Sequence, residues 1–371
     1  MSRIFLSPPH MSGKELEYIH KVFESNYIAP LGEYVNRFEK IIGEYTKAQS
    51  IVALSSGTAA IHLALRVLGV GEGDIVLASS FTFIGSVSAI KYQGATPVFI
   101  DSDYKSWNLD PSLLKEELES RKSSGLVLPK ALIVTHLYGQ MADMIEIMRL
   151  SDEYGFYVIE DAAESLGATL NGQQSGTFGH FGVYSFNGNK ILTTSGGGAL
   201  VSKNPEYIKK ALFLATQAKE DTPHYEHEEL GYNYRMSNVL AAIGVAQMEV
   251  LSARVSQRRQ IFEWYKKELG DIEEISFMPE IENSNGNRWL TTLTLEKSSP
   301  SKIMKALADE QIESRPLWKP MHAQPLFKDA KSRINGVSDT LFSKGICLPS
   351  GSSMSEEDVK RVVNIVKKSL I

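Results

Sequence analysis

Short runs of apolar residues alternate with helix-like patterns between residues 50 and 200. The apolar runs lie at 51–54, 75–78, 97–100, 131–135, 157–160, 182–186 and 198–202. Their apolar density predicts strands that are buried on both faces. Between the first two runs, residues 59–68 place apolar side chains at helical spacing, and Gly69 predicts where that helix ends. This alternation predicts an α/β fold in which helices cover both faces of a mainly parallel sheet.

The pattern changes after residue 237. Residues 237–269 place apolar side chains near one face without a proline, which predicts one long helix that links two domains. Beyond it, we expect short strands at 275–278, 288–295 and 345–348, with helices between and after them. The sequence therefore predicts a large domain over residues 1–250 and a small α+β domain over residues 251–371.

Length and composition agree with two globular domains and argue against nucleic acid or a membrane as a partner. A length of 371 residues is more than one hydrophobic core usually supports. A net charge of -5 without a dense basic segment argues against nucleic acid as a partner. No stretch approaches the ~20 apolar residues that span a bilayer, so we expect no membrane association and a cytoplasmic location.

Metal and disulfide chemistry are not expected. Cys347 is the single cysteine, which excludes an internal disulfide and a cysteine-based metal site and fits a reducing compartment. His224 and His227 have i, i+3 spacing, but they lie among acidic residues, which favours a solvated turn over a metal pair.

The most informative residues are Lys190 and Asp161. Lys190 lies in a segment of small residues, five positions after Ser185 at the end of an apolar run, with no other charge nearby. Asp161 follows the run 157–160, which places a carboxylate at the carboxyl edge of a parallel sheet. An amine, a carboxylate and a serine in this arrangement are the groups that hold pyridoxal phosphate as a Schiff base. Asp161 would pair with the pyridine nitrogen, and Lys190 would also move protons as a general base.

Two further segments offer cofactor contacts. Ser56, Gly57 and Thr58 follow a strand and open a helix, where free backbone N–H groups can bind a phosphate. Taken alone, the same residues could simply cap the helix. Phe81 follows the run 75–78 and could stack on the pyridine ring, or it could belong to the core. The glycines at 69–73 lack the dinucleotide spacing and no P-loop occurs, which argues against a nicotinamide dehydrogenase.

Four motifs in this order carry a family resemblance. They are Ser-Gly-Thr-Ala-Ala at 56–60, Glu-Asp-Ala-Ala-Glu at 160–164, Ser-Phe-Asn-Gly-Asn-Lys at 185–190 with three glycines at 196–198, and Gly-Tyr-Asn-Tyr-Arg-Met-Ser-Asn at 231–238. Over nearly its whole length, the chain resembles the DegT/DnrJ/EryC1/StrS family of sugar-nucleotide aminotransferases. The resemblance implies the aspartate-aminotransferase fold (fold type I) and an active site at a homodimer interface.

By this resemblance, Asp161 is the pyridinium partner and Lys190 the Schiff-base lysine, while Gly57, Thr58 and Ser185 bind the phosphate. The resemblance also implies that Asn233 reaches the phosphate from the partner subunit. Glu164 would lie next to the ring hydroxyl of the cofactor, where many relatives have glutamine. Some relatives replace the lysine with histidine and act as sugar dehydratases, so a lysine at position 190 indicates transamination.

Other segments resemble a narrower group within the family. Residues 6–11, 25–32, 216–218 and 315–322 are similar to bacterial enzymes that make UDP-4-amino sugars on the route to N,N'-diacetylbacillosamine. Those enzymes aminate C4 of UDP-2-acetamido-2,6-dideoxy-4-ketohexose with glutamate as donor. The open alternatives are an aminotransferase for another nucleotide-linked ketosugar or a cyclitol, and a catalytically silent protein that binds a sugar nucleotide.

A sugar diphosphate needs cationic and aromatic groups near the cofactor. Five residues have suitable side chains, and we expect them to bind substrate: Tyr27, Arg315, Trp318, Lys319 and His322. Trp318 could instead belong to the core of the small domain, and His322 could be a hydrogen-bonded loop residue.

Overall fold

The computed structural model describes residues 2–370. Its α-helices are α1 Glu15–Glu24, α2 Glu33–Thr46, α3 Gly57–Val67, α4 Ser88–Tyr92, α5 Pro111–Ser123, α6 Met144–Tyr154, α7 Pro205–Ala215, α8 Asn238–Met248, α9 Leu251–Leu269, α10 Pro300–Asp309, α11 Val337–Lys344 and α12 Glu356–Ser369. Its strands are β1 Ser50–Leu54, β2 Ile75–Ser79, β3 Thr96–Ile100, β4 Ala131–Thr135, β5 Tyr157–Asp161, β6 Thr169–Leu170, β7 Gln173–Gln174, β8 Phe181–Ser185, β9 Gly198–Ser202, β10 Ile275–Phe277, β11 Ser284–Asn285, β12 Thr291–Leu295, β13 Arg315–Pro316, β14 Lys331–Arg333 and β15 Gly345–Leu348.

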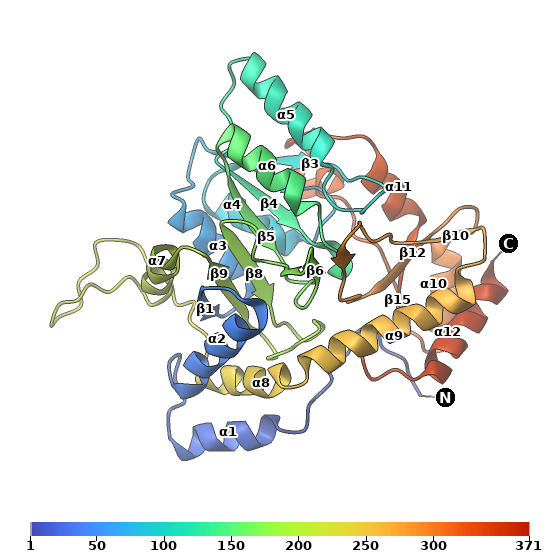
Figure 1. Ribbon diagram of the computed structural model, residues 1–371, viewed down its shortest axis with the longest axis horizontal. Helices are drawn as coiled ribbons and strands as arrows, with labels where there is room; N and C mark the ends of the chain where they lie inside the picture. Colours follow the sequence, from blue (N-terminus) through green and yellow to red (C-terminus); the bar gives the residue numbers. More distant parts are fainter. Residues whose placement is uncertain (1, 371) are drawn as a thin grey trace.

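An eight-stranded sheet forms the centre of the molecule, in the order β1-β9-β8-β5-β4-β2-β3-β14. Every neighbouring pair is parallel except the two that involve β9, so the sheet is mainly parallel, as predicted. All five residues of β4 are buried, because helices cover both faces of this sheet (Figure 1). The carboxyl ends of β2, β4, β5 and β8 therefore meet along one edge, where open α/β sheets bind ligands.

The expected single helix over 237–269 is wrong. The segment forms α8 and α9, which meet at a bend of 60° around Glu249 and Val250. The Glu249 side chain at the break accepts hydrogen bonds from Tyr18 (2.5 Å) and Lys14 (2.9 Å) of the N-terminal segment. Helix α8 is buried against α1 and α2, whereas α9 leaves the large sheet and crosses toward α12 (Figure 1). The tertiary environment changes at this point, and the helix axis changes with it.

A second, four-stranded sheet has the order β10-β12-β15-β13 and packs with α9, α10 and α12 around a separate core. Several backbone pairings cross the expected division at residue 250: β14 pairs with β3 in the large sheet, β11 pairs with β6, and Ile4 bridges Ile312. The exact division into domains remains a prediction. Within residues 2–370, no single helix is long and apolar enough to cross a membrane, and the bent pair α8 and α9 meets the criterion only jointly, by length and composition.

The start of α3 lies tightly against β9, and this contact shapes one end of the site. A Cβ atom on Gly198 would stand 2.5 Å from the backbone nitrogen of Gly57. We expect Gly198→Ala to displace the start of α3 and to lower the free energy of unfolding by about 1–3 kcal/mol. Chemical denaturation measures the change. Gly188→Ala is the matched control, because a Cβ there would meet nothing within 4 Å; equal losses in the two variants would contradict the prediction.

Candidate active site

Two adjoining cavities lie at the carboxyl edge of the large sheet. The first has a volume of about 450 Å³, and Asp161, Ser185 and Lys190 all line it. The second has a volume of about 980 Å³ and shares several lining residues with the first. The shared residues are Thr82, Phe83, Asn189, Trp289 and Trp318. A small pocket that carries an amine thus opens into a larger one.

The Lys190 amine is held between an aromatic ring and a carboxylate. Its Nζ lies 4.2 Å from the centroid of the Trp289 ring and 3.6 Å from Glu164 Oε1. Only 12% of the lysine side chain is exposed. Trp289 is held in turn, because its indole N–H donates to the carbonyl of Asn189 at 2.8 Å. The amine is therefore recessed, as the uncharged surroundings of Lys190 predicted.

Asp161 is buried at the end of β5, and both of its oxygens are engaged. Oδ2 accepts a hydrogen bond from the Ser86 hydroxyl at 2.5 Å, and Oδ1 accepts one from the Ala163 N–H at 3.1 Å. A carboxylate has about four acceptor positions, so lone pairs remain for a donor in the cavity. This is the arrangement that a pyridinium partner requires.

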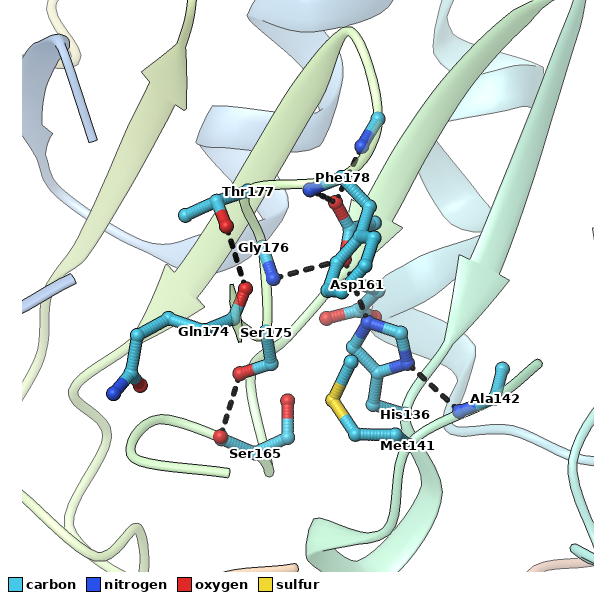
Figure 2. A network of polar contacts seen from close by, with 12 residues as sticks. His136, Met141, Ala142, Asp161, Ser165, Gln174, Ser175, Gly176, Thr177 and Phe178 are labelled. Carbon is cyan, nitrogen blue, oxygen red and sulfur yellow. Dashed lines mark hydrogen bonds and ion pairs between the residues drawn. The ribbon is translucent and has the colours of Figure 1, made fainter. Parts of the chain in front are cut away.

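A second polar network lies behind Asp161 (Figure 2). The fully buried carboxylate of Glu160 accepts hydrogen bonds from three backbone N–H groups within 176–179 and from His136 Nε2 at 2.9 Å. His136 Nδ1 accepts from the Ala142 N–H, so the ring proton is on Nε2. The His136 backbone N–H also donates to the carbonyl of Asp161 at 3.1 Å. The network thus fixes β5, its neighbour β4 and the following loop beside the site.

The phosphate end of the first cavity is built from the start of α3 and the end of β8. Ser56 caps the helix by accepting from the Ala59 N–H at 3.0 Å, so the capping interpretation holds for its side chain. Gly57 and Thr58 line the cavity beside Ser185, and a Cβ on Gly57 would lie 3.2 Å from Ser185 Cβ. The first N–H groups of a helix have no intrahelical acceptor, and together with two hydroxyls they suit a phosphate dianion.

The two oxygens of Glu164 contact the Lys190 amine and the turn after β4. Its Oε2 accepts from the Tyr138 N–H at 2.7 Å. Burial raises the pKa of the Glu164 carboxyl above its usual value, although the Lys190 amine and the Tyr138 hydrogen bond act in the opposite direction. A carboxyl in this environment can keep or release a proton within reach of the amine.

The aromatic wall of the cavity differs from the prediction. Phe81 does not line either cavity: it is 2% exposed and packs edge-on against Tyr138 in the core. Phe83, two residues later, lines both cavities and is 50% exposed. Both phenylalanines follow β2, and the sequence pattern alone does not show which of them faces inward. The ring-stacking assignment therefore moves to Phe83, with Trp318 beside it at 5.3 Å between ring centroids.

Three of the predicted substrate residues line the larger cavity. These are Arg315, Trp318 and Lys319. His322 is not among the residues that line it. The His322 ring lies 2.6 Å from the Ser80 hydroxyl and 3.0 Å from the carboxylate of Asp339, as the alternative of a hydrogen-bonded loop histidine describes.

Tyr27 and Asn233 lie away from both cavities of their own chain. Tyr27 is 48% exposed and lines a hollow beside α2, and Asn233 lines another hollow near Leu31. Asn233 stands at the base of the arm between α7 and α8, which projects from the body of the molecule (Figure 1). A contact of Asn233 with the phosphate of a partner subunit remains a prediction.

Several wall residues were absent from the sequence prediction. Ser86, Tyr138 and Trp289 belong to no motif, and Trp289 reaches Lys190 from a segment about 100 residues away in the chain. Together with the predicted residues they surround an amine, a facing carboxylate and a phosphate cradle, which fit pyridoxal phosphate. Within this fold, these groups define a pyridoxal phosphate-dependent enzyme of fold type I.

Comparison with known proteins agrees. The family model described as the DegT/DnrJ/EryC1/StrS aminotransferase family matches residues 9–367. The Bacillus subtilis (strain 168) protein EpsN, named as a pyridoxal phosphate-dependent aminotransferase, is 54% identical over 98% of this chain and 95% of its own. The GDP-perosamine synthase of Escherichia coli O157:H7 is 36% identical over 97% of this chain and 96% of its own.

A solved structure gives the same result. The Streptococcus pneumoniae protein Spr1654, titled as a sugar aminotransferase in its PLP form, superposes with a TM-score of 0.90 at 25% identity, and 100% of each chain is covered. The chain therefore belongs to the DegT/DnrJ/EryC1/StrS aminotransferase family. It is a sugar aminotransferase whose cofactor is pyridoxal phosphate.

The raised pKa of Glu164 has a measurable consequence in the cofactor-free protein. In the unfolded chain the pKa of this carboxyl is near its ordinary value of 4.5, but burial raises the pKa in the folded protein. Folding therefore loses stability as the pH rises through this interval. We expect Glu164→Gln to match the wild type below the unfolded pKa and to become relatively more stable as the pH rises.

Thermal unfolding of the cofactor-free proteins between about pH 4 and pH 8 measures this difference. Glu24→Gln is the control, since Glu24 is exposed at the end of α1. A stability difference between Glu164→Gln and wild type that stays constant with pH would contradict the prediction.

Proposed function

We propose that this aminotransferase transfers the amino group of L-glutamate to C4 of a UDP-linked 4-keto-6-deoxy-N-acetylhexosamine, giving the 4-amino sugar for a bacterial glycan of the bacillosamine type. The observation that carries the proposal is the position of the Lys190 amine. It is recessed in a pocket that adjoins a cavity of about 980 Å³. That volume lies in the range of small-molecule sites and leaves room for a nucleotide sugar beside the cofactor.

When bound, pyridoxal phosphate supplies an aldehyde carbon that reacts with amines and a ring that withdraws electrons. The chain supplies the rest. Asp161 would accept a hydrogen bond from the protonated ring nitrogen, and its negative charge would keep that nitrogen cationic. Lys190 Nζ would move a proton between the substrate carbon that carries the amino group and the C4′ carbon of the cofactor. Glu164 Oε1 lies 3.6 Å from that amine and forms an ion pair with it. Trp289 and Trp318 exclude water from one side.

Two segments that resemble UDP-4-amino-sugar enzymes line the same cavity. Residues 5–9 of the N-terminal segment lie on one side of it and residues 315–319 on another. Arg315 and Lys319 supply cationic groups for a diphosphate, and aromatic faces are available at Phe83 and Trp318. This placement supports a sugar nucleotide, and the resemblance supports a UDP-linked 4-keto sugar.

We also propose that a second copy of the chain completes the site. The family resemblance assigns Asn233 to the cofactor phosphate, and the side-chain type of Tyr27 suits the substrate, yet neither lines the Lys190 cavity of its own chain. The projecting arm next to Asn233 gives a physical route to a neighbouring subunit. A homodimer with shared sites reconciles these positions.

A second candidate is a GDP-linked ketosugar, which the 36% identity to a GDP-perosamine synthase favours. The deciding experiment is glutamate-dependent turnover of UDP-, GDP- and dTDP-linked 4-keto and 3-keto sugars by the purified enzyme. The proposal predicts the highest kcat/KM for the UDP-linked 4-keto sugar. A higher value for a GDP-linked substrate would establish the second candidate, and binding without turnover would indicate a silent binding protein.

The cationic residues of the larger cavity should act mainly on substrate binding. We expect Arg315→Ala and Lys319→Ala each to raise KM for the nucleotide sugar by about tenfold, with a smaller effect on kcat, because each loses a charge-assisted contact with the diphosphate. Steady-state kinetics with saturating glutamate measures both constants. Lys305→Ala, on the exposed side of α10, is the matched control; an unchanged KM in both cavity variants would contradict the assignment.

A further inference from the structure

Three buried hydroxyl groups form a chain that ends on Asp161. The Thr135 and Thr82 hydroxyl oxygens lie 2.8 Å apart, Thr82 and Ser86 lie 2.7 Å apart, and Ser86 donates to Asp161 Oδ2 at 2.5 Å. The exposed fractions of the three hydroxyl residues are 4% or less. They come from the end of β4, the loop after β2 and the short helix at 84–86, and all three line the first cavity.

The carboxylate of Asp161 sets the direction of the three hydrogen bonds. A carboxylate only accepts hydrogen bonds, so the single Ser86 proton belongs to Asp161. Ser86 must then accept from Thr82, and Thr82 must accept from Thr135, because each hydroxyl has one proton to donate. All three protons therefore point toward the carboxylate. Hydrogen bonds aligned in this way polarise one another in a buried environment.

We propose that Ser86, with Thr82 and Thr135 behind it, is a positioning residue. Its hydroxyl orients the Asp161 carboxylate toward the pyridinium nitrogen of the cofactor. This inference rests on the proposed role of Asp161. The Ser86 hydroxyl fixes Oδ2 while the Ala163 N–H fixes Oδ1, so the carboxylate cannot rotate away from the cavity. The remaining lone pairs of the two oxygens then stay directed at the place where a ring N–H would meet them.

Ser88 provides a matched control within the same segment. It lies two residues after Ser86 in the chain, and its hydroxyl donates to the carbonyl of Ile84 at 2.9 Å rather than to Asp161. Ser86→Ala and Ser88→Ala thus remove the same atom from neighbouring positions. Thr135→Val removes the far hydroxyl with little change in volume and tests the chain without touching Ser86.

The experiment loads each protein with pyridoxal phosphate labelled with ¹⁵N in the ring and records the ring-nitrogen chemical shift, which reports protonation directly. The affinity of the cofactor-free protein for pyridoxal phosphate is measured alongside by tryptophan fluorescence. We expect Ser86→Ala to move the ¹⁵N shift toward the deprotonated value and to weaken cofactor binding roughly tenfold, the size of one hydrogen bond to a charged group. Thr135→Val should give a smaller change in the same direction, and Ser88→Ala should match the wild type.

Asp161→Asn separates this inference from the proposal beneath it. Loss of the protonated ¹⁵N signal in Asp161→Asn, with Ser86→Ala indistinguishable from Ser88→Ala, would overturn the hydroxyl chain and leave the role of Asp161 intact. An unchanged ¹⁵N shift in Asp161→Asn would overturn both. A graded loss from Asp161→Asn through Ser86→Ala to Thr135→Val supports the chain, because a general loss of packing would not follow that order.

Discussion

The geometry around Lys190 depends on the hydrogen bonds of one buried side-chain amide, that of Asn287. Its side-chain nitrogen donates to the carbonyls of Glu164 and Leu166 at 2.9 Å each, and its side-chain oxygen accepts from the Trp289 N–H at 2.8 Å. These contacts hold the segment before β12 against the turn that follows β5. Trp289 can then place its ring beneath the Lys190 amine. Buried polar groups that are fully paired in this way specify one arrangement.

Hydrogen bonds to Glu160 and Asp161 also hold the site in place. Glu160, at 0% exposure, gathers backbone donors from the loop after β7, and Ser86 and Ala163 hold the two oxygens of Asp161. Asp161 therefore lies at the end of a strand, and Lys190 lies in the loop after β8, where Trp289 and Glu164 hold its amine. A pre-organised carboxylate and amine need little rearrangement when cofactor and substrate bind, which is the condition for efficient proton transfer.

The sequence predicted those strands and site residues that follow from the pattern of apolar residues along the chain. Apolar runs located the strands of the large sheet, and strand ends followed by Asp161 or Ser185 located the cavity edge, because parallel strands end together. It missed contacts that depend on tertiary packing. Trp289 approaches Lys190 from a distant segment, Phe83 rather than Phe81 faces the cavity, and the bend at Glu249 depends on side chains from α1. None of these leaves a periodic signal in the chain.

Every role proposed for the site requires that Lys190 is the amine that carries the cofactor. The most direct measurement is borohydride reduction of the purified holoenzyme, followed by proteolysis and mass spectrometry of the modified peptide. We expect a pyridoxyl group on Lys190 alone and its loss in Lys190→Ala. An adduct on another lysine, or an unchanged adduct in Lys190→Ala, would contradict it.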